Sequence, residues 1–138
     1  MILGRVLALD PGERRIGVAI SDPLRITAQP LMVIDRNLQA PLDVIREVIE
    51  SRDVDEIVVG LPVPLRGGEG PAAMAARAFA DEVRAATGLP VTLVDERFST
   101  HTAEQAMLEG GARRATRRAS RDKVAAAVIL RSFLERTT

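Results

Sequence analysis

Apolar residues occur along this chain in short continuous runs and in longer runs with a helical period. Residues 5–10 form an apolar run that Pro11 and Gly12 stop, and residues 15–21 form a second run after a short glycine-containing turn. Two strand-like runs separated by so short a turn predict an antiparallel hairpin. A third strand is expected over residues 31–35.

Two segments have the pattern of helices that cover a sheet. In residues 41–52, apolar side chains recur every three or four positions. Residues 71–87 form a long alanine-rich segment that Pro71 opens and Gly88 stops. Between these helices, residues 56–60 form a short, continuously apolar run, which is typical of a strand covered on both faces.

The last third of the chain continues the alternation of strands and helices. Residues 91–94 predict another buried strand, and residues 100–108 predict a helix after it. A basic loop is expected next, and Ser120 is expected to cap a final helix over residues 121–135.

A hairpin and third strand followed by alternating helices and strands predict an α/β fold with a mixed sheet. Neither an internal repeat nor a linker divides the sequence, so residues 1–138 are expected to form a single domain. Ligands of such sheets bind at the carboxyl ends of the strands.

Composition narrows the function classes. Cysteine is absent, which excludes disulfides, thiolate metal sites and a cysteine nucleophile. No apolar run is long enough to cross a bilayer, and a cytoplasmic protein is expected. The only aromatic residues are three Phe, so stacking of bases on aromatic side chains is not the expected binding mode.

The net charge is zero, but positive charge is concentrated in one segment. From Arg113 to Lys123 there are five Arg and one Lys against one Asp, a sum of +5, and the rest of the chain sums to −5. Such a cluster favours a polyanionic partner such as nucleic acid, bound through its phosphates. A solvated basic loop is an equally good interpretation of the charge alone.

Carboxylates stand at three places where a strand ends or a helix begins. Asp10 ends the first strand, Asp95 and Glu96 follow the fifth, and Asp122 begins the last helix. Alternation along a strand sends Asp95 and Glu96 to opposite faces, so at most one of them is expected to meet Asp10. The simpler interpretations are an Asx turn at Asp10 and a surface ion pair at Asp95 or Glu96.

Asp122 is the most informative of these carboxylates. It shares a helical stripe with Ala125, Ala126, Ile129 and Phe133, so it is expected on the helix face that packs against the sheet. A carboxylate at the head of a buried face needs a cation or hydrogen-bond donors. Stabilisation by the helix dipole is the simpler interpretation.

If these sites converge, they would bind one or two Mg²⁺ or Mn²⁺ ions, because oxygen ligands suit hard cations. Two ions about 3.5–4 Å apart can activate water and stabilise the leaving oxygen in phosphodiester cleavage. The lone His101 is expected at the surface rather than as a ligand.

Taken in order, these segments resemble the YqgF/RuvX family of Holliday-junction-resolvase-like nucleases in the RNase H-like superfamily. The matching stretches are residues 9–19, 59–62, 67–71, 94–100 and 122–126. The resemblance implies an RNase H-like five-stranded sheet, with three antiparallel strands and then two parallel ones, flanked by helices. It also implies a metal-dependent nuclease that matures the 5′ end of pre-16S ribosomal RNA, with branched DNA as the other candidate substrate.

Carried over by position, the resemblance implies that Asp10, Glu96 and Asp122 are catalytic metal ligands. Asp95 would be the ligand instead if Glu96 points away from the other two. It further implies that a set of arginines contacts the substrate: Arg97, Arg113, Arg114, Arg117 and Arg118. Symmetric resolution of a four-way junction would call for a homodimer.

Two other functions compete with the nuclease. An actin-like or sugar-kinase-like ATPase also begins with a strand-ending Asp, a Gly and a second strand, but 138 residues leave no second lobe. A non-catalytic RNA-binding or ribosome-assembly module would keep the acidic residues for structure. Nucleotide binding would favour the first, and RNA binding unchanged by removal of Asp10 would favour the second.

Overall fold

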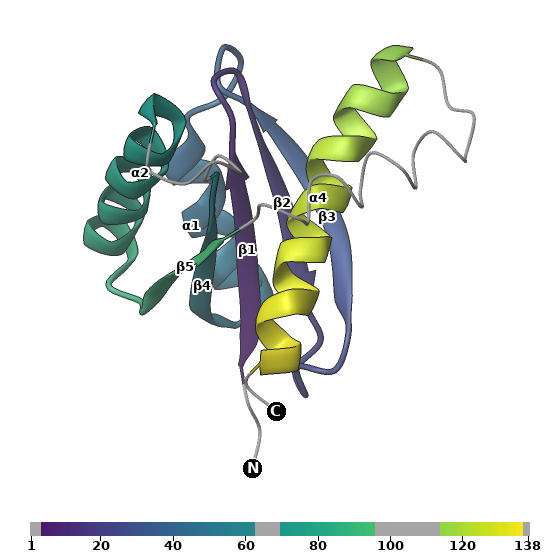
Figure 1. Cartoon of the computed structure of the whole chain (residues 1–138). Helices are drawn as coiled ribbons and strands as arrows, with labels where there is room; N and C mark the ends of the chain where they lie inside the picture. Colours follow the sequence, from purple (N-terminus) through teal and green to yellow (C-terminus); the bar gives the residue numbers. More distant parts are fainter. Residues whose placement is uncertain (1–3, 63–69, 96–113, 137–138) are drawn as a thin grey trace.

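A computed structural model describes residues 4–62, 70–95 and 114–136 of the chain. Strands and helices alternate as the sequence predicts (Figure 1). In chain order they are β1 (Arg5–Pro11), β2 (Arg15–Ser21), β3 (Ala28–Asp35), α1 (Pro41–Arg52), β4 (Val54–Leu61), α2 (Pro71–Thr87), β5 (Val91–Asp95) and α4 (Arg114–Arg136).

The five strands form one mixed sheet in the order β3-β2-β1-β4-β5. β1 pairs antiparallel with β2, and β2 pairs antiparallel with β3. β4 runs parallel to both β1 and β5. The prediction of three antiparallel strands followed by two parallel ones is therefore confirmed.

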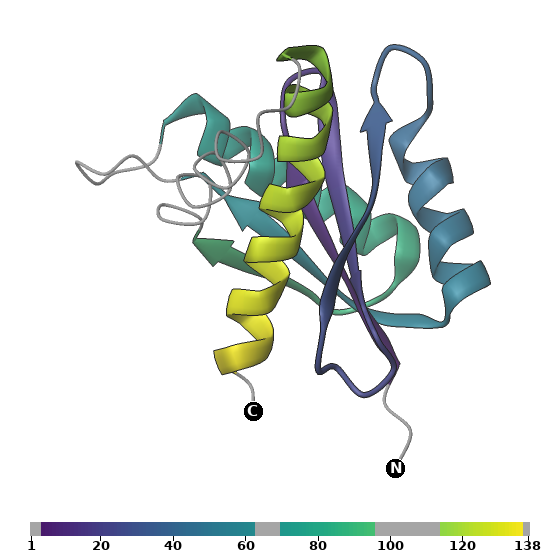
Figure 2. The same ribbon diagram turned by 90° about the vertical axis from the view of Figure 1, so that its right-hand side faces the viewer.

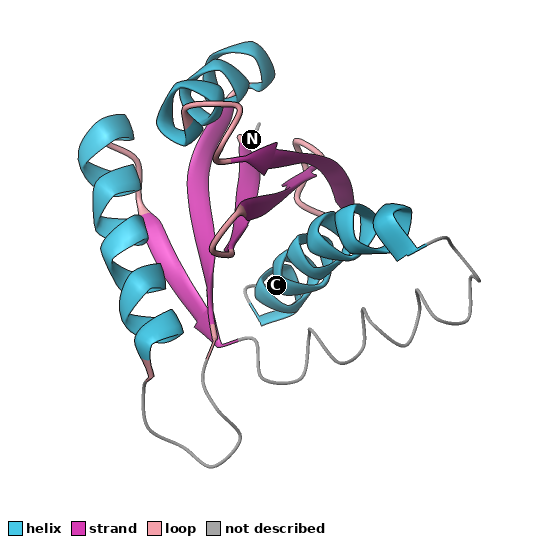
Figure 3. Cartoon of the chain, turned by 90° about the horizontal axis from the view of Figure 1, so that it is seen from above, coloured by secondary structure: helices cyan, strands magenta, loops and turns pink. Residues whose placement is uncertain are grey.

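Helices cover both faces of this sheet. α1 and α2 lie on one face and α4 crosses the other, as the views in Figures 2 and 3 show. Each face has its own main apolar core, and β1 contributes side chains to both because successive residues of a strand point to opposite faces. Leu7 and Leu9 belong to the core beneath α1 and α2, whereas Val6 and Ala8 belong to the core beneath α4.

The first two helices have the predicted bounds. α1 and α2 each begin with a proline, whose fixed φ suits the first helical position. Gly88 ends α2 with a φ of 71° and donates its N–H to the carbonyl of Arg84, as a left-handed helix cap does. β2 has the predicted bounds, and the other strands begin or end one to three residues beyond theirs. β3 differs most because it begins at Ala28 rather than Leu31.

The predicted start of the last helix is wrong. Helix α4 begins at Arg114, so the segment expected as a basic loop is helical and Ser120 lies inside the helix instead of capping it. Arginine and alanine are strong helix formers, and they outweigh one interior serine. The helix predicted over residues 100–108 lies outside the described residues. None of the described helices has the length and apolar content that a membrane crossing needs.

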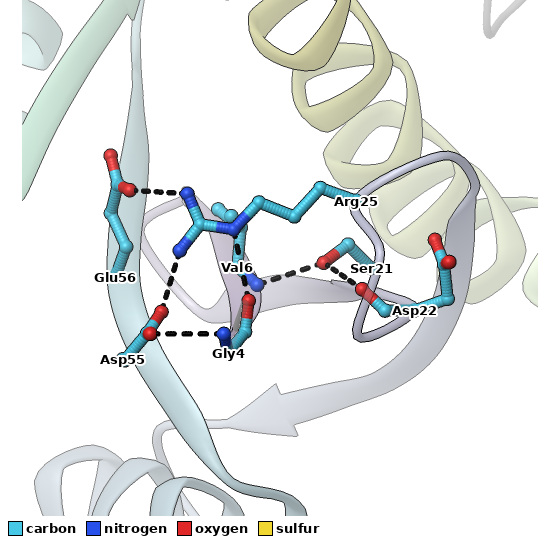
Figure 4. Close-up of polar contacts among 7 residues, drawn as sticks. All are labelled: Gly4, Val6, Ser21, Asp22, Arg25, Asp55 and Glu56. Carbon is cyan, nitrogen blue, oxygen red and sulfur yellow. Dashed lines mark hydrogen bonds and ion pairs between the residues drawn. The ribbon is translucent and has the colours of Figure 1, made fainter. Parts of the chain in front are cut away.

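The loop between β2 and β3 is fixed to the start of β4 by Arg25, whose φ of 59° is left-handed. Its guanidinium donates to Asp55 at 2.6 Å, to Glu56 at 2.8 Å and to the carbonyl oxygen of Gly4 at 2.9 Å (Figure 4). In the same loop, Asp22 accepts bonds from backbone N–H groups, above all that of Thr27, and these hold its pKa below the usual range. The ion pairs of Arg25 with Asp55 and Glu56 thus tie the β2–β3 loop to β4, which lies on the other side of β1 in the sheet.

Replacing Arg25 by Ala is expected to lower the free energy of unfolding by about 1–2 kcal/mol, because three bonds to a half-buried guanidinium are lost. Arg25→Gly loses the same bonds but relieves the left-handed backbone, so it should be about 1 kcal/mol more stable than Arg25→Ala. Arg46→Ala, at an exposed pair 3.6 Å from Asp43, is the control and should change stability by less than about 0.5 kcal/mol. Urea denaturation measures all three, and equal losses for Arg25→Ala and Arg46→Ala would contradict this account of the loop.

Candidate active site

Asp10 lies at the end of β1, on the face of the sheet that α4 covers. Val6 and Ala8 pack beneath α4, and alternation places Asp10 on the same face. Across the hairpin, Asp10 pairs with Gly17 of β2. The Cα atoms of such opposed residues lie about 4.5–5.5 Å apart, so whatever contacts Gly17 is a near neighbour of Asp10.

The backbone of Asp122 is what contacts Gly17. A Cβ added at Gly17 would collide with the carbonyl oxygen and carbon of Asp122. Because Gly17 has no side chain, α4 can approach β2 closely at this point. Gly17 therefore leaves room for the helix that carries Asp122.

The carboxylate of Asp122 is held by Arg15. Nε of Arg15 donates to Oδ2 of Asp122 at 2.6 Å, and the two side chains are 35% and 25% exposed. Arg15 and Gly17 are two positions apart on β2 and therefore share the face beneath α4. No local motif pairs Arg15 with Asp122, and strand alternation from Gly17 is the sequence signal that places Arg15 on this face.

Asp95 lies on the other face of the sheet from Asp10 and Asp122. Val94 packs in the core beneath α4, whereas Leu93 packs against the core beneath α1 and α2. Alternation therefore directs Asp95, paired with Leu61 of β4, away from the other two carboxylates. Glu96, Arg97 and Arg113 lie outside the described residues.

The oxygen donors of Asp10 and Asp122 suit a hard divalent cation such as Mg²⁺ or Mn²⁺. In the structure, Oδ2 of Asp122 binds the guanidinium of Arg15. Within the described part of the chain, no three acidic or histidine side chains group closely enough to hold a metal ion.

The basic segment lies at the same end of the sheet as Asp10. Arg114, Arg117 and Arg118 are in the first turns of α4, before Asp122. Figures 1 and 2 show these turns beside the end of the sheet where the β1–β2 turn lies. The first turns of α4 and Asp10 thus lie at the same end of the sheet (Figure 1).

A groove of about 560 Å³ opens beside this edge, on the opposite face of the sheet. It lies between the β1–β2 turn and the first turns of α2, and Arg36 crosses it, bonded to the carbonyl of Gly12 at 3.0 Å and stacked on Phe79 at 5.2 Å. Its charged lining consists of two carboxylates, Glu13 and Glu82, and this one guanidinium. Such a lining does not suit a nucleic-acid backbone, so the groove is not assigned to the substrate.

Comparison with known proteins agrees with this architecture. Over 97% of this chain and 96% of the other, the fold matches Thermus thermophilus RuvC, solved in complex with a Holliday junction substrate, with a TM-score of 0.53 and 19% identity. At that identity the match establishes the fold alone, and it confirms the RNase H-like arrangement that the sequence predicts.

Several sequence relatives share a much higher identity with this chain than RuvC does. A protein of Moorella thermoacetica named "Putative pre-16S rRNA nuclease" is 47% identical over 96% of this chain and 95% of its own length. A Roseiflexus protein of the same name is 44% identical over 96% of this chain and 94% of its own. The family model described as "RuvX: Holliday junction resolvase" matches residues 4–136. The chain belongs to the RuvX family of nucleases.

Proposed function

We propose that this chain is a metal-dependent endonuclease that hydrolyses phosphodiester bonds in the 5′-end maturation of pre-16S ribosomal RNA. The observation that carries the proposal is the meeting of Asp10 and Asp122 around Gly17, from a strand and a helix more than a hundred residues apart. The names of the relatives from Moorella and Roseiflexus support ribosomal RNA as the substrate.

In this proposal Asp10, Glu96 and Asp122 are the catalytic carboxylates and hold Mg²⁺ or Mn²⁺. Bound divalent ions would supply an activated water and charge stabilisation for the leaving oxygen. Asp10 is fixed by the β1–β2 pairing, and Asp122 is fixed by the contact of α4 with Gly17 and by Arg15. Glu96 is preferred to Asp95 because the alternation at Val94 directs Asp95 to the other face.

The proposed substrate contacts are Arg97, Arg113, Arg114, Arg117 and Arg118. A polyanion bound by this set would pass along the first turns of α4 toward the carboxylates. Residues 1–138 are proposed to act as one domain, to which the family match over residues 4–136 corresponds. Location in the cytoplasm and a homodimer remain predictions.

Branched DNA is the second candidate substrate, favoured by the family description and by the fold shared with RuvC. The deciding experiment compares two labelled substrates, a pre-16S ribosomal RNA 5′ leader and a synthetic four-way DNA junction, each with Mn²⁺ and with EDTA. Metal-dependent cutting of the leader is expected. Cutting of the junction alone would reassign the substrate, and binding without cutting of either would indicate a non-catalytic module.

Replacing Arg114, Arg117 and Arg118 together by Gln is expected to weaken RNA binding by about tenfold or more at physiological salt. For single-stranded RNA, each lost phosphate contact should lower the slope of log affinity against log salt by about 0.7. The matched control is the triple replacement of exposed arginines elsewhere, Arg52, Arg131 and Arg136, by Gln. Filter binding at about 50 to 300 mM salt, where the electrostatic effect is large, measures the affinity of both triple variants. Equal slopes for the two triple variants would show that Arg114, Arg117 and Arg118 do not contact RNA phosphates.

A further inference from the structure

Arg15 is a cation placed directly on one of the two converging carboxylates. Its Nε bond to Oδ2 of Asp122, at 2.6 Å, joins residues 107 positions apart in the chain. Hydrogen bonds between ionised partners are shorter and about twice as strong as neutral ones. A bond of this kind at a proposed metal ligand affects how that ligand is oriented and how strongly it attracts a metal.

β2 holds Asp122 at two separate points. The backbone of Asp122 packs closely against Gly17. Arg15, two residues earlier on the same face of β2, donates a hydrogen bond to the carboxylate of Asp122. The backbone contact fixes the height of α4 above the sheet. The guanidinium, which is planar and directional, selects one orientation of the carboxylate and uses only one of its two oxygens.

Acidic residues flank Gly17 on both sides. Asp10 lies opposite Gly17 on β1 and the backbone of Asp122 contacts Gly17, and nearby carboxylates repel each other. The positive charge of the guanidinium offsets this repulsion. The same fixed charge also opposes the binding of a divalent cation at the site.

We propose that Arg15 is a positioning residue that orients the Asp122 carboxylate for the metal and, through its fixed positive charge, weakens the metal affinity of the site. Orientation depends on the geometry of the guanidinium, whereas affinity depends on its charge. Only the effect on metal affinity rests on the proposed function. Orientation and metal affinity can be tested separately, because different substitutions at Arg15 change the geometry or the charge.

Two variants separate geometry from charge. Arg15→Met removes the charge and keeps an unbranched side chain, so Mn²⁺ should bind about tenfold more tightly, as Coulomb's law gives for a divalent ion about 6 Å away in a water-like dielectric. Arg15→Lys keeps the charge but loses the planar guanidinium, so its Mn²⁺ affinity should stay within about threefold of wild type. Turnover at saturating Mn²⁺ should fall in both variants, because neither holds Asp122 as Arg15 does.

Mn²⁺ affinity is measured by titration, with the electron paramagnetic resonance signal of free Mn²⁺ as the readout. The matched control is Arg84→Met, which removes the same charge from an arginine paired with Asp81 on α2 at 2.7 Å. It should leave Mn²⁺ affinity unchanged. Unchanged or weaker Mn²⁺ binding by Arg15→Met would overturn the effect on metal affinity.

The orientation half is tested in metal-free protein by a double-mutant cycle of Arg15→Met and Asp122→Asn. The two effects on the unfolding equilibrium constant should differ from additivity by roughly three- to tenfold. Additive effects would overturn the positioning role, whatever the metal does. If wild-type protein bound no Mn²⁺, the proposed metal site and the affinity effect would both fail, while the cycle would still decide the positioning role.

Discussion

Replacing Asp10 by Asn is expected to lower metal-dependent cleavage by about two to four orders of magnitude while the protein still unfolds cooperatively. The amide keeps the shape of the side chain at the end of β1 but removes the negative charge that a divalent cation needs. Metal ions contribute several kcal/mol of charge stabilisation to such reactions, and each 1.4 kcal/mol is about tenfold in rate. Single-turnover rates with Mn²⁺, beside thermal unfolding curves, measure both effects.

The control for this prediction is Asp43→Asn, which removes a carboxylate of α1 that is 76% exposed and lies outside the candidate site. Its cleavage rate should stay within about twofold of wild type, because surface substitutions away from a site have small effects. Retained turnover in Asp10→Asn would remove Asp10 from the mechanism and leave the carboxylates as structural residues.

Replacing Gly17 by Ala is expected to lower the free energy of unfolding by about 3 kcal/mol, the upper end of the usual range for overpacking. The added Cβ would meet the carbonyl group of Asp122, and backbone atoms in a helix cannot rotate away as a flexible side chain can. The protein that remains folded must lift α4 from β2. Cleavage per folded molecule should fall as well, because the lifted helix carries Asp122 away from Asp10.

Gly70→Ala is the matched control, since a Cβ at Gly70 would meet none of the described residues beyond its neighbours in the chain within 4 Å. Its stability loss should stay below about 1 kcal/mol, which covers the preference for Gly over Ala at the start of α2. Denaturant titration gives the stabilities. A Gly17→Ala variant as stable and as active as wild type would show that close packing at this glycine does not set the site.

The elements that the sequence predicts well are those with local signals. Pro41 and Pro71 begin α1 and α2, and Gly88 ends α2 in the left-handed conformation that its lack of a side chain permits. The Pro11-Gly12 turn likewise predicts the β1–β2 hairpin. Each signal acts over a few residues, so tertiary packing has little opportunity to override it.

The errors occur where a local signal is ambiguous or misleading. Ser120 resembles a helix cap, but the arginines and alanines before it extend α4 to Arg114. Pro30 interrupts the pattern of β3, although a proline is tolerated in an edge strand, and the pairing with β2 shifts register between Val18 and Ala19. A strand at the edge of a sheet is therefore easily predicted too short.

For the candidate site, the sequence predicts the places of Asp10 and Asp122 in the fold but not what holds Asp122. Asp10 and Asp122 follow from the end of a strand and from a helical stripe. The pairing of Arg15 with Asp122 spans 107 positions and depends on the height of α4 above β2, which Gly17 sets. Such a contact follows from packing in three dimensions, and no local pattern near Arg15 specifies its partner.

The most direct measurement is an anomalous difference map from crystals of the wild-type protein soaked in Mn²⁺. A manganese peak within coordination distance of carboxylate oxygens of both Asp10 and Asp122 is predicted, at the edge of the sheet beside the β1–β2 turn. A map with Mn²⁺ bound elsewhere, or with none bound while Asp122 remains paired with Arg15, would contradict the assignment of this edge as the metal centre of the nuclease.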